Sequence, residues 1–201
     1  MKVLVLSPHT DDAELGCGGY LTKLHEEGAE IVVAVFSDCS NIWTLPLMEE
    51  CEISLKHINA GVIIGDYPLR GFHGAREVIL SSIVEIKTGT PWDLVLCPSS
   101  TDIHQDHQVV HQEAVRAFRR DTNLLAYELP WNTRGFNPTY FVELQEKHIQ
   151  GKLRMLSEYR SQIELNRLYF EHERVRGQAR GRGLQIKKEY AEAFEVINWI
   201  T

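Results

Sequence analysis

Short apolar runs alternate with amphipathic stretches through the first 120 residues of the chain. The apolar runs cover residues 3–6, 31–36, 62–64 and 94–97. The stretches between them, with apolar positions at helical spacing, cover residues 14–27, 47–58, 75–87 and 105–119. Continuous apolar strands that alternate with helices are typical of a parallel sheet covered on both faces. The pattern therefore predicts an α/β fold, a Rossmann-like parallel sheet flanked by helices.

The second half of the chain has a less regular pattern. Further strands are predicted at residues 124–127 and 140–142, and a helix at residues 146–159. We find no internal repeat and no linker long enough to separate a second domain, and 201 residues suffice for one sizeable core. We therefore expect a single domain over residues 1–201, with additional C-terminal strands and helices.

Residues 174–188 differ from the rest because they are basic and rich in glycine, with no acidic side chain among them. A solvated loop is the ordinary interpretation of this composition. A second interpretation is a segment that reaches over a binding crevice and holds a phosphate or a nucleotide diphosphate with its guanidinium groups. An RNA-binding arm is the third, although only one short patch is basic. The sequence leaves these alternatives open.

The charge balance argues against several classes of partner. With 21 basic and 28 acidic side chains, the chain has a net charge of −7 and will not be drawn as a whole to nucleic acid or anionic lipid. No apolar run approaches the roughly 20 residues that a helix needs to cross a bilayer. We expect no nucleic-acid partner and no membrane span, and a homo-oligomer is compatible with the sequence.

The cysteines and the N-terminus bear on the compartment. Cys17, Cys39, Cys51 and Cys97 show no C-x-x-C spacing, and two of them lie in apolar surroundings. Buried free thiols are therefore favoured over a disulfide framework. The N-terminus leads directly into the first apolar run, without the arrangement of a signal peptide. We expect a cytoplasmic protein.

Polar side chains that can bind a metal follow two of the predicted strands. They are, after the first strand, His9, Asp11 and Asp12 and, after the fourth, His104, Asp106 and His107. In a sheet of order 3-2-1-4-5 these two strands are neighbours, and ligands bind beyond the carboxyl ends of strands at such a switch point. Two imidazoles and one carboxylate are the usual protein ligands of an open zinc site. The sequence therefore predicts that both segments line one metal-binding crevice.

Each segment also has an alternative interpretation. Thr10, Asp11 and Asp12 can cap the helix that follows them. The glycines of residues 16–19 can form a dinucleotide phosphate loop, but their spacing lacks the full fingerprint and the acidic pair would repel a pyrophosphate, so close packing of helix on sheet explains them better. Asp106, a candidate catalytic residue, either orients an imidazole or caps the second helix.

The two segments resemble the motifs of the PIG-L/LmbE-like zinc deacetylases. That family's first motif, P-H-P-D-D-E, reads P-H-T-D-D-A-E at residues 8–14, so a threonine replaces the second proline and the final acid is displaced by one residue. The second motif, H-x-D-H, reads H-Q-D-H at residues 104–107. Both motifs agree in residue type, order and spacing, and the resemblance covers residues 1–119.

The resemblance implies a role for each of these residues. His9, Asp12 and His107 match the zinc ligands. Asp11 matches the general base, and His104 matches the histidine that supports the transition state. The chemistry agrees, because zinc lowers the pKa of its water toward ~7, an adjacent carboxylate can accept the proton, and a protonated histidine can stabilise the oxyanion or protonate the amine. Zinc is the expected metal, although iron or another divalent ion suits similar ligands.

The chain departs from the family after the second predicted strand. Many members carry a glycine–acid pair and a substrate-binding arginine there, whereas residues 37–55 contain no arginine or lysine. We expect Asp38, Asn41 or Trp43 to contact substrate instead, the ring of Trp43 against a sugar face, with a core position as its ordinary alternative. Arg134, beside the later predicted strands, is a further candidate.

These observations together predict an enzyme. We expect a zinc-dependent amidohydrolase that removes an N-acetyl or similarly small N-acyl group from an amino sugar or glycoconjugate. An amidase of a thiol-sugar conjugate would use the same centre with a different leaving group. A non-catalytic nucleotide-binding or metal-binding module is the alternative from another class.

Overall fold

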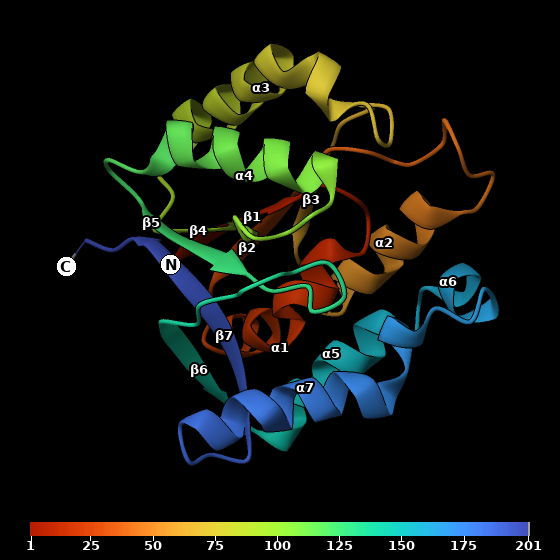
Figure 1. Ribbon diagram of the computed structural model, residues 1–201, viewed down its shortest axis with the longest axis vertical. Coiled ribbons are helices and arrows are strands. Elements are labelled where there is room, and N and C mark those ends of the chain that lie inside the picture. The colour runs from red at the N-terminus through yellow and green to blue at the C-terminus, as the bar shows by residue number, and fades with distance from the viewer. Residues whose placement is uncertain (201) are drawn as a thin grey trace.

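The computed structural model describes residues 1–200, and its strands form one sheet (Figure 1). The strands are β1 (Lys2–Ser7), β2 (Glu30–Val35), β3 (Gly61–Ile64), β4 (Leu94–Pro98), β5 (Asn123–Tyr127), β6 (Tyr140–Leu144) and β7 (Tyr190–Asn198). Their order is β3-β2-β1-β4-β5-β7-β6. The first five pair in parallel, and β7 is antiparallel to both of its neighbours. The predicted Rossmann-like sheet is confirmed, with the switch point between β1 and β4.

Helices cover both faces of the sheet. They are α1 (Asp12–Glu26), α2 (Leu47–Lys56), α3 (Arg76–Gly89), α4 (Gln105–Phe118), α5 (Glu146–Leu156), α6 (Arg160–Glu164) and α7 (His172–Gln185). In Figure 1, α3 and α4 lie on one face, and α1, α2, α5 and α7 lie on the other. Alternate residues of β1 face opposite sides: Val3 and Val5 belong to the core that includes α1, and Leu4 and Leu6 belong to the core that includes α4.

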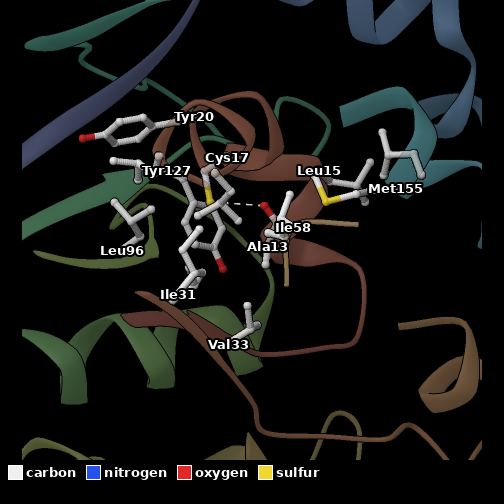
Figure 2. Packing of buried hydrophobic residues seen from close by; sticks show 14 of the residues in the cluster. Ala13, Leu15, Cys17, Tyr20, Ile31, Val33, Ile58, Leu96, Tyr127 and Met155 are labelled. Carbon is white, nitrogen blue, oxygen red and sulfur yellow. Dashed lines mark hydrogen bonds between the residues drawn. The ribbon is translucent and has the colours of Figure 1, made fainter. Parts of the chain in front are cut away.

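Helix α1 packs close to the sheet. A Cβ atom added to Gly16 would lie 2.3 Å from the ring of Tyr127 on β5. The Tyr127 ring is fully buried, and its hydroxyl donates a hydrogen bond to the carbonyl of Leu6 at 3.0 Å. Figure 2 shows Tyr127 beside Cys17 in this core. Gly16 and Gly19 of α1 therefore permit close packing of helix on sheet, as predicted, whereas Gly18 faces α5.

The same helix is interrupted at Cys17, whose φ of −143° and ψ of 16° are not helical. The interruption frees backbone groups, and a buried ion pair satisfies them. Lys152 Nζ lies 2.7 Å from both Glu192 Oε1 and the carbonyl oxygen of Leu15. The two oxygens of Glu192 accept hydrogen bonds from the backbone N–H groups of residues 19 and 20 at 3.0 and 2.7 Å. This pair joins α5 and β7 to the helix that begins at Asp12.

The interpretation of residues 174–188 as a solvated loop is wrong, because most of them belong to α7. Val175, Ala179 and Gly183 are buried at a spacing of four residues, and α7 packs against β7 along this stripe. Three of its four arginines form ion pairs with glutamates: Arg174 with Glu171, Arg176 with Glu146 and Arg182 with Glu128. Packing of one narrow stripe thus outweighs the low helix propensity of its glycines.

Strand β7 was not predicted from the sequence. Glu192 and Glu195 are buried within it and interrupt the apolar pattern by which strands are recognised. The carboxylate of Glu195 accepts hydrogen bonds from the Ser99 hydroxyl at 2.7 Å and from the Asn137 N–H at 3.1 Å. The four cysteines are free and buried, as predicted. Across residues 1–200, no helix combines the length and apolar character needed to span a bilayer.

Candidate active site

The two polar segments meet at the switch point of the sheet. His9 follows β1, and His107 lies in the first turn of α4, which follows β4. The Nε2 atom of His107 lies 3.1 Å from the Nδ1 atom of His9, although 98 residues separate them along the chain. Both rings are almost fully buried. The strand order therefore brings the segments together in the way that the sequence predicts.

Three potential ligand atoms form a nearly equilateral triangle. Asp12 Oδ2 lies 3.2 Å from His9 Nδ1 and 3.2 Å from His107 Nε2, which completes the 3.1 Å edge between the two histidines. Ligand atoms bound to a tetrahedral zinc ion at ~2.0–2.1 Å are separated by about 3.3 Å. The triangle therefore has the dimensions of one face of such a site. His104 belongs to a looser group with the two histidines, whose ligand atoms lie within 4.8 Å of one another.

Buried carboxylates hold the outer nitrogens of both rings. His107 Nδ1 lies 2.8 Å from Asp102 Oδ2, and His9 Nε2 lies 3.1 Å from Asp106 Oδ2. This arrangement orients each ring and leaves its other nitrogen for a metal. Of the two interpretations of Asp106, the structure shows the orienting one, since the capping residue of α4 is His104, whose Nδ1 accepts the N–H of Asp106 at 3.2 Å.

The charges of the triangle favour a bound cation. Burial lowers the pKa of His107, but Asp12 and Asp102 outweigh it and raise that pKa to about 10. Burial also lowers the pKa of His9, but hydrogen bonds to Asp106 and Asp12 outweigh this effect and raise the pKa above its usual value. The pKa of Asp12 is lowered despite burial, because both histidines stabilise its charge. The carboxylates thus hold positive charge at this point, as protons or as a metal ion.

Asp11 and His104 flank the triangle. Burial and the neighbouring charge of Asp12 raise the pKa of Asp11 to about 7. Burial and the positive charge of His107 lower the pKa of His104 to about 4, so this ring is neutral at pH 7. Because Nδ1 of His104 accepts a hydrogen bond, its proton resides on Nε2. The neutral ring can therefore donate a hydrogen bond from Nε2. The sequence had instead suggested the positively charged form of this ring.

A cavity of about 310 Å³ opens over these residues. Trp43 lines it, together with His9, Asp11, Asp12, His104 and His107. The other three residues predicted for substrate binding lie outside its lining. The Asn41 amide donates a hydrogen bond to the carbonyl of Leu69 and accepts one from the Leu69 N–H. The Asp38 carboxylate accepts the N–H of Ser40 at 2.9 Å. Arg134 donates its backbone N–H to the carbonyl of Thr101. Asn41 and Asp38 thus order a loop.

Three charged residues of the site were missed from the sequence. Arg70 and Arg167 line the cavity. Segments other than the one after β2, which lacks an arginine, therefore supply the positive charges of the cavity. Asp102, which orients His107, precedes the H-x-D-H motif by two residues. An aspartate so close in sequence to a candidate ligand was a usable signal for Asp102. Arg70 and Arg167 lie in segments without a motif, and only the fold brings them here.

The first part of the chain matches a known protein family. The family model described as PIG-L, GlcNAc-PI de-N-acetylase, matches residues 4–118, more than half of the chain. The chain belongs to the PIG-L family. This PIG-L member is 28% identical over 169 residues to YaiS of Escherichia coli K12, described as an uncharacterized deacetylase; the match covers 79% of this chain and 90% of YaiS. The resemblance inferred from the two motifs is confirmed, and with it a family of deacetylase enzymes.

Solved structures agree on the fold of this PIG-L member. The N,N'-diacetylchitobiose deacetylase of Pyrococcus horikoshii has a TM-score of 0.75 at 19% identity, covering 97% of this chain and 83% of its own. The 4-carboxy-2-hydroxymuconate hydratase of Pseudomonas putida KT2440 has a TM-score of 0.77 at 18% identity, covering 100% and 97%. A deacetylase and a hydratase share this architecture, so the reaction must be argued from the site.

Proposed function

We propose that this PIG-L member is a zinc-dependent hydrolase that removes an N-acetyl or similarly small N-acyl group from an amino sugar or glycoconjugate. The observation that carries the proposal is the triangle of His9 Nδ1, Asp12 Oδ2 and His107 Nε2, with edges of 3.1–3.2 Å, beside a free carboxylate in the same cavity. The family's description and the name of the Pyrococcus horikoshii enzyme support an amino-sugar amide as the substrate.

The residues around the triangle divide the work of amide hydrolysis. Zinc bound by His9, Asp12 and His107 would supply a water of lowered pKa and polarise the amide carbonyl. Asp11 accepts the proton of the attacking water and then gives it to the departing amine. His104 donates a hydrogen bond from Nε2 to the oxyanion. Trp43 offers an aromatic face to the sugar ring.

Zinc affinity is expected to rise with pH. The Nε2 atom of His107 must lose its proton to bind metal, yet a pKa of about 10 keeps the ring protonated at neutral pH in the metal-free protein. Each bound ion therefore releases at least one proton, and affinity rises by about tenfold per pH unit for each proton released. Chelator competition between about pH 6 and pH 8, with calorimetry in two buffers to count protons, measures this. An affinity independent of pH would contradict the ligand assignment.

The reaction itself is tested by product release. Zinc-loaded protein is expected to release equal amounts of acetate and free amine from N-acetylglucosamine glycosides, and chelation should abolish this activity until zinc is restored. Cleavage confined to thiol-sugar conjugates would support the amidase alternative. Higher activity with iron would retain the reaction and change the metal. Nucleotide binding without stoichiometric metal would overturn the proposal in favour of a binding module.

A further inference from the structure

A larger cavity of about 960 Å³ adjoins the candidate active site. Leu15, Trp131, Arg167 and Tyr169 line both cavities, so the two lie side by side. We infer that the larger cavity holds the part of the substrate beyond the amino sugar, an aromatic group that carries an acidic substituent. This inference rests on the proposed function and adds the chemical class of the aglycone.

The larger cavity is built by the C-terminal part of the chain. Apart from Leu15, its lining residues lie between residues 128 and 185, whereas the PIG-L match ends at residue 118. Its volume is near the upper end of the range for small-molecule pockets, about 300–1,000 Å³, and that of the catalytic cavity is near the lower end. The catalytic centre thus belongs to the family match, and the large cavity is added by elements outside it.

Aromatic rings mark the junction of the two cavities. The rings of Trp131 and Tyr169 stack with centroids 4.2 Å apart and an interplanar angle of 15°. Trp131 is 40% exposed, and Leu165 and Leu168 in the same wall are exposed as well. Apolar side chains left open in a concave wall gain free energy when a ligand covers them. A flat aromatic group can extend the stacked pair and cover these residues.

Arg167 supplies a positive charge at the same junction, where its guanidinium carbon lies 5.9 Å from the centroid of the Trp43 ring. Its Nε atom is buried without a hydrogen-bond partner, and within residues 1–200 no carboxylate forms an ion pair with it. By contrast, Arg174 and Arg182, which line the larger cavity alone, are paired with glutamates. Because Arg167 lines both cavities, an acidic substituent in the larger one can form a charge-assisted hydrogen bond with its guanidinium group.

The positive charge of Arg167 also determines whether the aglycone or the acyl chain of the substrate occupies the larger cavity. A long alkyl N-acyl chain that passed Arg167 would cover the guanidinium without offering it an acceptor. An aglycone with a carboxylate or phosphate offers that acceptor and then reaches the apolar wall. The arrangement therefore favours the aglycone over the acyl chain as the occupant of the larger cavity.

Glycines of α7 provide a matched pair of variants. Gly181 lines the larger cavity and not the smaller one. No described heavy atom lies within 4 Å of a Cβ added to it. Gly177, one turn earlier, has the same open space and lies outside the lining. Gly181→Phe therefore adds a ring at a residue of the cavity wall where a Cβ atom has open space, and Gly177→Phe makes the same chemical change outside the wall.

Binding of 4-methylumbelliferyl phosphate to the zinc-loaded full chain tests the cavity directly. By fluorescence titration, the wild-type protein and Gly177→Phe are expected to bind it equally, and Gly181→Phe and Arg167→Met to bind it about tenfold more weakly, a difference of about 1.4 kcal/mol. Equal binding by all four proteins would overturn the inference. This result does not depend on turnover, so it remains decisive if the proposed deacetylation fails.

Turnover assigns the cavity to one end of the substrate. The ratio kcat/KM is expected to increase from methyl to phenyl to 4-carboxyphenyl N-acetylglucosaminide. Gly181→Phe should remove the gain from the phenyl group, and Arg167→Met should remove the gain from the carboxylate. Deacetylation of all three glycosides at equal rates would overturn the inference and retain the proposed function. A preference for N-octanoyl over N-acetyl substrates that Gly181→Phe abolishes would assign the cavity to the acyl chain instead.

Discussion

Replacing Asp11 by asparagine is expected to lower kcat by a factor of about 10² to 10⁴ while zinc remains bound. The change preserves the size of the side chain and removes its ability to accept a proton. Asp11 lies next to the ligand triangle without contributing an edge to it, so metal affinity should change little. Steady-state acetate release and elemental analysis of the same purified sample measure the two quantities.

Two further aspartates serve as controls for this prediction. Asp12→Asn alters a corner of the triangle, so it should lose both zinc and activity. Asp38→Asn makes the same chemical change on a loop outside the cavity lining and should affect neither. If Asp11→Asn loses zinc as Asp12→Asn does, Asp11 is a ligand and the assignment of the base is wrong.

The sequence predicted the central sheet because its strands are buried on both faces. The apolar runs at residues 3–6 and 94–97 correspond to β1 and β4, which lie in the middle of the sheet and carry no polar residue in those runs. Strands of this kind can be recognised without tertiary information. Their adjacency then followed from the usual strand order, and with it the meeting of His9 and His107.

The C-terminal elements could not be predicted in the same way. Glu192 makes the pattern of β7 look polar, although its charge is compensated by Lys152 from a distant helix. Residues 174–188 have the composition of a loop, and their helix forms because a narrow stripe packs against β7. In both cases the deciding contact joins segments far apart in sequence. Local patterns carry no signal of such contacts.

The residues of the site also fall into a group that local patterns predict and a group that only the fold brings together. The two motifs supplied the three atoms of the triangle and the carboxylate of Asp11, because residues so close to strand ends have little freedom in where they lie. Arg70 contacts the site through a loop whose backbone N–H donates to Asp106 at 2.6 Å. Arg167 reaches it from the segment before α7. The candidate metal site was therefore predictable; of the other side chains that line the cavity, Trp43 was predicted, and Arg70 and Arg167 were not.

Replacing Glu192 by alanine is expected to lower the free energy of unfolding by about 3–5 kcal/mol. The substitution leaves the ammonium group of Lys152 buried without its carboxylate and removes the acceptor of two backbone N–H groups in α1. Urea denaturation followed by circular dichroism measures the loss. The matched control is Glu143→Ala on the neighbouring strand β6, whose ion pair with Lys188 is about half exposed, and its cost should be about 0–1 kcal/mol.

A double replacement separates the two causes of this loss. Lys152→Met combined with Glu192→Leu removes both buried charges and should recover part of the stability. It cannot recover all of it, because the carbonyl of Leu15 and the two N–H groups after the interruption at Cys17 still lack partners. Full recovery would mean that the interrupted helix needs no polar support. Equal stability of Glu192→Ala and Glu143→Ala would mean that packing alone holds α1, and with it Asp12, in place.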